Sequence, residues 1–480
     1  MLFWLQSIDS GNIDANHASN YIFFYNIIIR QSILKSITTN SNSNNSLQGS
    51  INIYENILSN IAYNMLCNVE KPLSYIECKT IIEDFATDRQ IPLNPDNVIK
   101  LMKDSNIILT DNDNNIRFKY PYMYYYFVGN YIEQNYKNKE IQDLVQYMSQ
   151  NLHNESYGNI MIFVCSFSMN DNIIDDILLN ALSVFDNVPV FDFTETPQIM
   201  TIAEKRIQEL YNNIIVGNEN DVVTAQEEKR ELSDDAQICD GQVHDINTSQ
   251  VQKDEDEEDS KYFKDFYAAQ KIIVVLGQII RNYPGQIKGE RKEEIIREIH
   301  DLGMRLVNMF HMILSQSLDE LLKFIEERIK SSAKSKKQTI NRQDFLENMT
   351  TLFALILLDF TNSVLSLEAS SFGDGNSWVT AEKVLSNTVS GQLVLYHLNT
   401  DVLKRLPVDK VISDHKKLRD DDYEFACMEL KTLVTTYLKY NQCGNIERDR
   451  LCAEFNLLKS KILMDEQQYT EENKSDYSKT

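Results

Sequence analysis

The sequence predicts a mainly α-helical protein with one small α/β unit near its N-terminus. Glycine and proline are scarce, at 14 and 8 of 480 residues, and this composition disfavours turn-rich all-β folds. Apolar residues recur every three or four positions over much of the chain, which is the period of an amphipathic helix. Two short apolar runs flank a polar turn within residues 107–120, and they account for the β part of the prediction.

Length and charge constrain the organisation. At about 150 residues per domain, 480 residues correspond to about three domains. The chain has 47 Lys and Arg against 71 Asp and Glu, a net charge of −24. Nucleic acids and anionic membranes select basic surfaces, so this balance argues against non-specific binding to either.

Residues 217–260 are predicted to be a disordered acidic linker. Between 218 and 259 there are 15 acidic residues, 3 basic residues and no aromatic residue. Such a segment buries too little apolar surface to offset the entropy of ordering. The acidic run 254–259 leaves a second interpretation open, an interaction tail or a cation site.

The N-terminal part divides into two predicted segments. Residues 1–48 form a helical segment that ends in an Asn- and Ser-rich loop. Residues 50–136 form a compact unit with helices over 53–67 and 74–85, each apolar at helical spacing. Asn94, followed by proline, is a helix N-cap and starts a third helix.

A β-hairpin follows these three helices. Residues 107–110 and 116–120 are the two expected strands, joined by a turn at 111–115. Three helices followed by a two-stranded wing form the winged-helix pattern, so residues 50–136 are predicted to be a winged-helix-like small α/β domain. An aromatic-rich helix over residues 122–136 completes it.

The rest of the chain is predicted to be helical. Residues 137–216 form a helical extension, and residues 261–480 form an α-helical C-terminal domain. The spacing of apolar residues predicts a helix from Phe266 and another across Ile295 to Ile313. Further helices are expected at 200–215, 317–331, 343–368, 378–390, 421–439 and 445–464.

No catalytic chemistry is evident in the sequence. The glycine cluster at Gly285 and Gly289 is followed by Glu290, where a phosphate-binding loop needs a lysine. The seven histidines are isolated, and the seven cysteines contain no C-x-x-C pair, as expected in a reducing compartment. We therefore predict a protein that is not an enzyme, with no catalytic, cofactor-binding or metal-binding residue and no cofactor.

The sequence also predicts a cytoplasmic protein that does not cross a membrane. The N-terminus lacks the basic region of a signal peptide. The apolar runs at 21–29 and 352–358 are far shorter than the roughly 20 residues that span a bilayer.

The winged-helix pattern raises the alternative of a DNA-binding regulator. DNA readers of this type normally present a basic face. Here the third helix and the wing balance four basic residues against four acidic ones, so packing within a protein is favoured over DNA binding. These residues are Lys100, Lys103, Arg117 and Lys119 against Asp96, Asp104, Asp111 and Asp113.

Two segments carry a resemblance to a known family. One is IRFKYPYMYYYFVGNYIEQN at 116–135, and the other contains LGQIIRNYPG within 263–310. Together, and in this order, they resemble the region C-terminal to the nucleotide-binding core of bacterial STAND NTPases, the NLR-like ATPases of prokaryotic defence. Gly129 departs mildly from the pattern, because the family usually has alanine there. The opening of the chain resembles the helical segment between the ATPase core and the winged helix.

The resemblance implies a function without catalysis. Family members carry a P-loop upstream of this region, and the chain begins at Met1 beyond that point. It would thus be the regulatory and sensor half of such an ATPase, and the setting that the resemblance implies is antiphage defence. Its partners would be a protein ligand or an ATPase core, in cis or in trans. A non-functional fragment of a decayed NTPase gene is the remaining alternative.

The residues that carry the resemblance are predicted to be structural. The aromatic residues would pack the helix that follows the wing, and the later motif would end a helix. The motif residues are Tyr122, Tyr124, Tyr125, Tyr126, Phe127, Gly277, Gln278, Asn282, Pro284 and Gly285.

Overall fold

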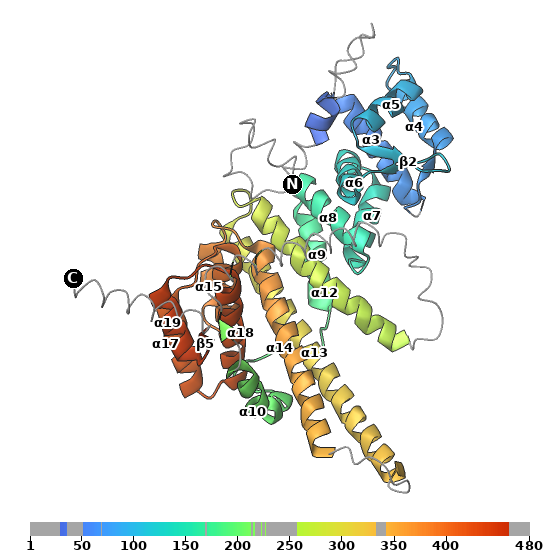
Figure 1. Cartoon of the computed structure of the whole chain (residues 1–480). Coiled ribbons are helices and arrows are strands. Elements are labelled where there is room, and N and C mark those ends of the chain that lie inside the picture. The colour runs from blue at the N-terminus through green and yellow to red at the C-terminus, as the bar shows by residue number, and fades with distance from the viewer. Residues whose placement is uncertain are drawn as a thin grey trace, which may run out of the picture. The chain divides into compact units, whose positions relative to one another are not determined.

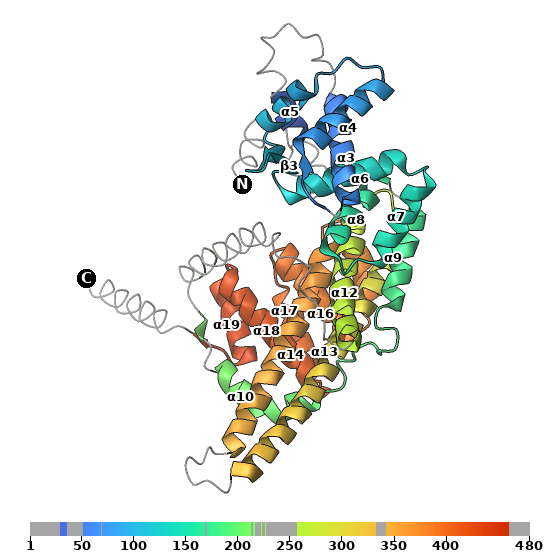
Figure 2. The ribbon, with the colours of Figure 1, turned by 90° about the vertical axis from the view of Figure 1, so that its right-hand side faces the viewer.

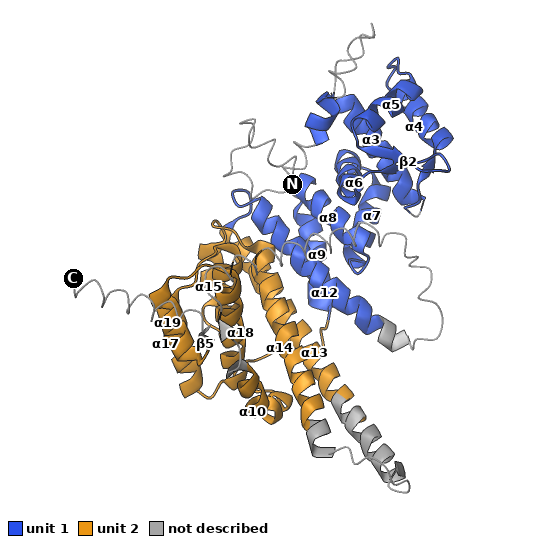
Figure 3. Cartoon of the chain, viewed as in Figure 1, with its two compact units in different colours: residues 1–184, 247–288 blue, residues 185–246, 289–480 orange. Residues whose placement is uncertain are grey.

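The computed structural model describes residues 29–35, 51–68, 70–168, 170–212, 215–216, 222, 226, 257–332 and 342–459. The chain is mainly helical, with a small three-stranded antiparallel sheet near the N-terminal region (Figure 1). This confirms the mainly α prediction. The chain divides into two compact units (Figure 3). Unit 1 holds residues 1–184 and 247–288, and unit 2 holds residues 185–246 and 289–480.

Unit 1 begins with three helices, α3 (Ile51–Cys67), α4 (Tyr75–Asp88) and α5 (Pro95–Asp104). A capping box starts α4. The Ser74 hydroxyl accepts a hydrogen bond from the Glu77 backbone N–H at 3.2 Å, and the Glu77 carboxylate accepts one from the Ser74 N–H at 2.7 Å. Asn94 caps α5 by accepting from the N–H of Asn97, as the sequence predicted.

A three-stranded sheet lies against these helices. Its strands are β1 (Leu73–Ser74), β2 (Ile108–Thr110) and β3 (Asn115–Phe118), in the order β1-β3-β2. Both pairings are antiparallel. The β2–β3 hairpin confirms the predicted one. The two-residue strand β1 was not predicted, because it is too short to show alternation.

Four consecutive helices and one distant helix complete unit 1. They are α6 (Pro121–Asn135), α7 (Lys139–Gln150), α8 (Glu155–Ser168), α9 (Asp171–Ser183) and α12 (Glu257–Asn282). The helix α8 contacts α6, α7 and α12. It is apolar on most sides, so these neighbours bury it.

Unit 2 is built around two long helices that run side by side, α13 (Gly289–Ser332) and α14 (Arg342–Phe372) (Figures 1 and 2). The helix α10 (Gln198–Asn212) packs on α14. The sequence predicted two helices where α13 runs without interruption. The predicted loop between α13 and α14 lies largely outside the described residues.

Shorter helices complete unit 2. They are α15 (Trp378–Leu385), α16 (Val389–His397), the π-helical turn η2 (Leu398–Val402), α17 (Val408–Asp420), α18 (Glu424–Tyr440) and α19 (Asn445–Phe455), and three of them, α16, η2 and α18, contact α14. The strands β4 (Ile215–Val216) and β5 (Leu458–Lys459) pair in parallel. The single helix predicted at 378–390 is two helices, because α15 ends at Leu385 with Ser386 as its C-cap and Thr388 caps the start of α16. The helix α17 was not predicted.

The boundaries of the two units differ from those of the five predicted segments. The helix α12 belongs to unit 1, although the sequence assigned residues from 261 on to the C-terminal domain. Most of the predicted linker lies outside the described residues. Within it, α12 already begins at Glu257, the Val222 side chain is buried, and Gln226 donates a hydrogen bond to the Tyr440 carbonyl at 2.6 Å. At Val222 and Gln226 the chain is packed rather than solvated.

One stretch in the described part of the chain is long and apolar enough to cross a membrane. It covers Glu347–Phe372 in α14, and its most apolar window has a mean hydropathy of 1.6 and is 44% buried. The sequence prediction passed over it because Asp359 interrupts the apolar run. A core helix of a soluble protein meets the same criterion, and α14 packs against α10, α13 and α16.

Candidate functional site

The first motif forms an aromatic cluster on α6. The side chains of Tyr125, Tyr126 and Phe127 are buried, and Phe127 stacks on Phe118 of β3 with ring centroids 5.6 Å apart. Tyr122 is half-buried and stacks on its neighbour Tyr120. The cluster therefore fixes α6 against the sheet, in agreement with the predicted structural role.

The same motif also joins α6 to α8. The Tyr126 ring packs edge-on against Phe163 and Phe167, with centroids 5.9 and 5.3 Å apart. Close approach of the two helices needs the small residue at position 129, since a Cβ on Gly129 would lie 2.7 Å from the Cβ of Phe163. The departure from alanine noted in the sequence thus has a packing cause.

Tyr124 carries a buried polar group that no hydrogen bond satisfies among the described residues. Its hydroxyl is buried and makes no hydrogen bond there. Burial raises its pKa well above the usual tyrosine value. A buried hydroxyl without a partner costs about 1–3 kcal/mol, so Tyr124 is kept in this place by its ring, which lies near Phe118.

The second motif ends α12 in the way the sequence predicted. The helix stops at Asn282, whose amide approaches the Gln278 side chain, and Pro284 follows. Gly277 is buried within the helix. Gly285 is different: its φ is not in the left-handed region, and an added Cβ would meet nothing within 4 Å. Neither the backbone nor the packing requires glycine at this position.

Both motifs converge on α8, although about 150 residues separate them in sequence. Tyr283 hydrogen-bonds with Ser166 on α8, while Tyr126 packs on the same helix. A polar chain also crosses it: Tyr125 hydrogen-bonds with Asn159, whose amide oxygen accepts from the Lys271 amino group of α12 at 3.2 Å. In the sequence only the family resemblance links the two segments, whereas in the structure both contact α8.

Unit 2 contains a buried polar cluster that joins three helices. The His300 Nδ1 atom lies 2.8 Å from the Glu368 carboxylate, and its Nε2 atom lies 2.9 Å from the Ser390 hydroxyl. Glu368 is fully buried, and the residues His300 and Ser390 are each 7% exposed. Burial opposes the imidazolium form, but the Glu368 carboxylate outweighs it and raises the pKa of His300.

The order serine–histidine–carboxylate is that of a hydrolase triad, but the cluster is closed. Ser390 is 7% exposed, and it lines none of three cavities that open in the described part of unit 2. The chain packs tightly around it as well, because a Cβ on Gly303 would lie 2.0 Å from the Glu368 Oε1 atom. The cluster therefore serves to fix α13, α14 and α16 to one another.

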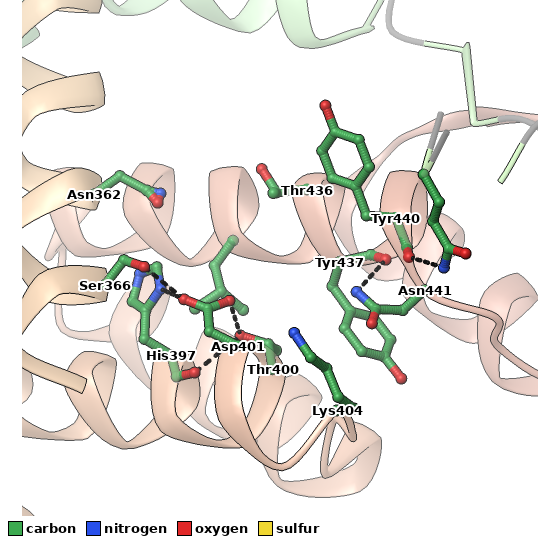
Figure 4. A pocket seen from close by; sticks show the side chains of 12 residues that line it. Asn362, Ser366, His397, Thr400, Asp401, Lys404, Thr436, Tyr437, Tyr440 and Asn441 are labelled. Atoms are coloured by element: carbon green, nitrogen blue, oxygen red, sulfur yellow. Dashed lines mark hydrogen bonds and ion pairs between the residues drawn. The ribbon is translucent and has the colours of Figure 1, made fainter. Parts of the chain in front are cut away.

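A cavity of about 600 Å³ opens in unit 2 between α14, η2 and α18 (Figure 4). Asp401 lies in its wall and accepts hydrogen bonds from Ser366 at 2.7 Å and Thr400 at 3.1 Å. His397 Nδ1 lies 3.1 Å from the same carboxylate. Burial opposes the ionised form of Asp401, but its hydrogen bonds, above all the one with His397, lower its pKa.

Lys404 stands at the rim of this cavity on an unusual backbone. It follows the π-helical turn η2 and has φ of 54°, in the left-handed region that non-glycine residues rarely adopt. Within the described residues Lys404 makes no ion pair. Its amino group and the Asp401 carboxylate therefore face the same space as separate charges (Figure 4).

Other chemistry is limited in the described part of the chain. No group of three His, Cys, Asp or Glu side chains is placed to hold a metal ion there. The six cysteines of that part are free. Burial raises the pKa of the Cys78 and Cys165 thiols to about 12, which leaves both unreactive.

The comparisons with known proteins bear on unit 1. The model of the family Novel STAND NTPase 4 matches residues 71–128. This match relates that part of the chain to STAND NTPases. It runs from just before β1 through the sheet into α6, covers the first motif only as far as residue 128, and does not reach the second. No curated protein and no solved structure matches the chain.

Sequence reasoning missed the cavity and the buried cluster for a common reason. His300, Glu368 and Ser390 are 68 and 22 positions apart, and only the packing of three helices joins them. His397 and Asp401 did leave a signal, since their spacing of four places both on one helix face. Patterns for metal sites and catalytic motifs do not include this pair, and for that reason His397 was predicted to be isolated.

Proposed function

We propose that the chain is a regulatory and sensor part of a STAND-like NTPase. It would act by protein–protein contacts and hydrolyse no nucleotide itself. The observation that carries the proposal is the family match over residues 71–128. It falls on the compact unit in which the sequence resemblance was first noted.

The topology of this unit supports a winged-helix assignment. Its elements run α3, β1, α4, α5, β2, β3, and the hairpin strand β3 pairs with both β1 and β2. We assign it as winged-helix-like. The charges on it favour protein contact over DNA contact: Asp96 pairs with Lys79 at 3.1 Å, and Asp111 is used to hold the hairpin turn.

This unit presents apolar side chains to solvent. Ile76 on α4 is 76% exposed, and Leu109 and Tyr120 are also exposed. We propose that this unit packs on the ATPase core, in cis or in trans. The helices of unit 2 would then face a protein ligand, which in antiphage defence would come from the phage. The setting would be the cytoplasm.

The test is association with an ATPase core. The full chain is tagged and mixed with a STAND core that carries G-x-x-x-x-G-K-[ST] and is encoded beside this gene. Ile76→Asp should weaken co-purification at least tenfold, because it places a charge in the contact. Ile446→Asp is the matched control, since Ile446 in unit 2 is 80% exposed and should leave association unchanged.

The outcomes separate the alternatives. If the wild-type chain binds no core, the regulatory proposal is wrong. If it binds equally well with Ile76→Asp, the contact lies elsewhere and the docking face is wrong. NTP hydrolysis by the purified chain alone would contradict the non-catalytic role. A mobility shift of duplex DNA at low salt would favour the DNA-binding alternative, because low salt maximises the phosphate contribution.

A further inference from the structure

The cavity beside η2 has the dimensions of a small-molecule site. Its volume of about 600 Å³ lies within the roughly 300–1,000 Å³ of ligand pockets. All of its lining residues belong to unit 2. It is therefore a feature of one compact body.

The charges of the lining residues favour an anion. Asp401 is the one carboxylate among them, and it already hydrogen-bonds with Ser366, Thr400 and His397. Lys404 is the one lysine or arginine among them, and it makes no ion pair within the described residues. A ligand that enters the cavity thus meets a carboxylate that already accepts hydrogen bonds and an ammonium group that has no ion-pair partner among the described residues.

The histidine adds a second contact. Its Nδ1 atom is bound to Asp401, and this fixes the orientation of the ring. Its Nε2 atom makes no hydrogen bond within the described residues. His397 is 4% exposed and lines the cavity, so Nε2, when it carries a proton, is a donor available to a ligand in the cavity.

The backbone places these groups by an unusual device. A π-helical turn carries Thr400 and Asp401, and Lys404 follows it with positive φ. The turn is closed by backbone hydrogen bonds from Leu403 to Leu398 and from Arg405 to Asn399, at 3.1 and 2.9 Å. Single π-helical turns and strained residues are concentrated at functional sites.

The opposite wall suits the body of an organic molecule. The helix α18 contributes the side chains of Leu433 and Tyr437, with the Thr436 hydroxyl beside them. On the α14 side, Asn362 adds an amide (Figure 4). One side of the cavity therefore offers the Lys404 ammonium group and the His397 ring beside the hydrogen-bonded Asp401, and the other is apolar and aromatic with a few hydrogen-bonding groups.

We propose that this cavity binds a small organic anion, with its carboxylate or phosphate group between Lys404 and His397 and its apolar body against α18. The proposal does not depend on the role of the chain beside an ATPase.

The test uses matched probes on the full chain. Binding of benzoate, phenyl phosphate and the uncharged analogue benzamide is measured by ligand-observed NMR and by calorimetry. At least one of the two anions should bind more than tenfold tighter than benzamide. The preferred anion then identifies the source of the acidic group as a carboxylate or a phosphate ester.

Variants locate the binding. Lys404→Gln should weaken binding of the preferred anion at least tenfold, whereas Lys100→Gln, with the same loss of charge on α5 in unit 1, should not. Lys404→Asn is a second variant that keeps the chain folded, because asparagine tolerates positive φ better than other residues. Both variants should retain the melting curve of the wild-type chain.

Three results would overturn the proposal: no binding of either anion at 10 mM (roughly −2.7 kcal/mol), equal binding of benzamide, or unchanged binding in both Lys404 variants. None of them bears on association with an ATPase core, which is measured separately.

Discussion

Replacing Gly303 by alanine should destabilise unit 2, although alanine is normally the better residue in a helix. Gly303 lies inside α13, and a Cβ there would come within 2.0 Å of Glu368 Oε1 and 2.8 Å of Glu368 Cδ. Real Cβ atoms do not approach other atoms closer than 3.0 Å. The carboxylate would have to retreat by about 1 Å, and the fully buried Glu368 has no solvent to move into.

The magnitude follows from what this retreat breaks. Glu368 is held to His300 at 2.8 Å, and a shift of about 1 Å takes that contact beyond hydrogen-bonding distance. Breaking a buried pair costs about 3–5 kcal/mol. Alanine recovers about 1 kcal/mol of helix propensity. The net loss is therefore about 2–4 kcal/mol, or roughly 4–16 °C in Tm for a unit of this size.

Thermal and urea unfolding of the full chain, followed by circular dichroism, measure this loss. Gly285→Ala is the matched control, because nothing lies within 4 Å of the added Cβ; it should change stability by less than about 0.5 kcal/mol. In a Glu368→Ala background, Gly303→Ala should cost nothing further. A Gly303→Ala chain that melts within 2 °C of the wild type would refute the reasoning.

Three further predictions concern single groups. Ser74→Ala removes the capping box of α4 and should cost about 0.5–2 kcal/mol in urea unfolding, whereas an unchanged midpoint would show that the cap contributes nothing. Glu429 is 1% exposed with no hydrogen-bond partner among the described residues, and burial raises its pKa. The free-energy cost of ionising this buried carboxyl group grows as the pH rises above about 4.5. Glu429→Gln should therefore stabilise the chain at pH 8 more than at pH 5. The Glu368 carboxylate raises the pKa of His300, so the contribution of the pair to the free energy of unfolding is complete below about pH 6.5 and is lost as the pH rises through the pKa of the folded state. The difference in stability between the wild type and His300→Gln should therefore shrink from pH 6 to pH 9. A constant difference would contradict this.

Local signals in the sequence located much of unit 1. Asn94 marks the start of α5, the turn after Thr110 marks the hairpin, and Asn282 with Pro284 marks the end of α12. Each of these is set by the chemistry of a few neighbouring residues. For that reason they can be read without knowledge of the fold.

Other elements depend on partners distant in sequence. The helix α16 is buried on nearly all sides and η2 is only five residues long, so neither shows a clear apolar period in the sequence. The apolar stripe of α12 is visible in the sequence, but the stripe does not say which helix covers it. Only the fold shows that this partner is α8, and only the fold places His397 and Lys404 in one cavity.

The division of the chain has a consequence for its synthesis. Unit 1 needs α12, and the end of α12 leaves the ribosome about a hundred residues after the end of α9. At a translation rate of roughly 5–20 residues per second, about 5–20 s pass before α12, the last helix that contacts α8, has been synthesised. During that interval the apolar side chains of α8 are open to chaperones and to aggregation. Expression of this protein should therefore respond to translation speed across residues 185–257 more than to speed elsewhere.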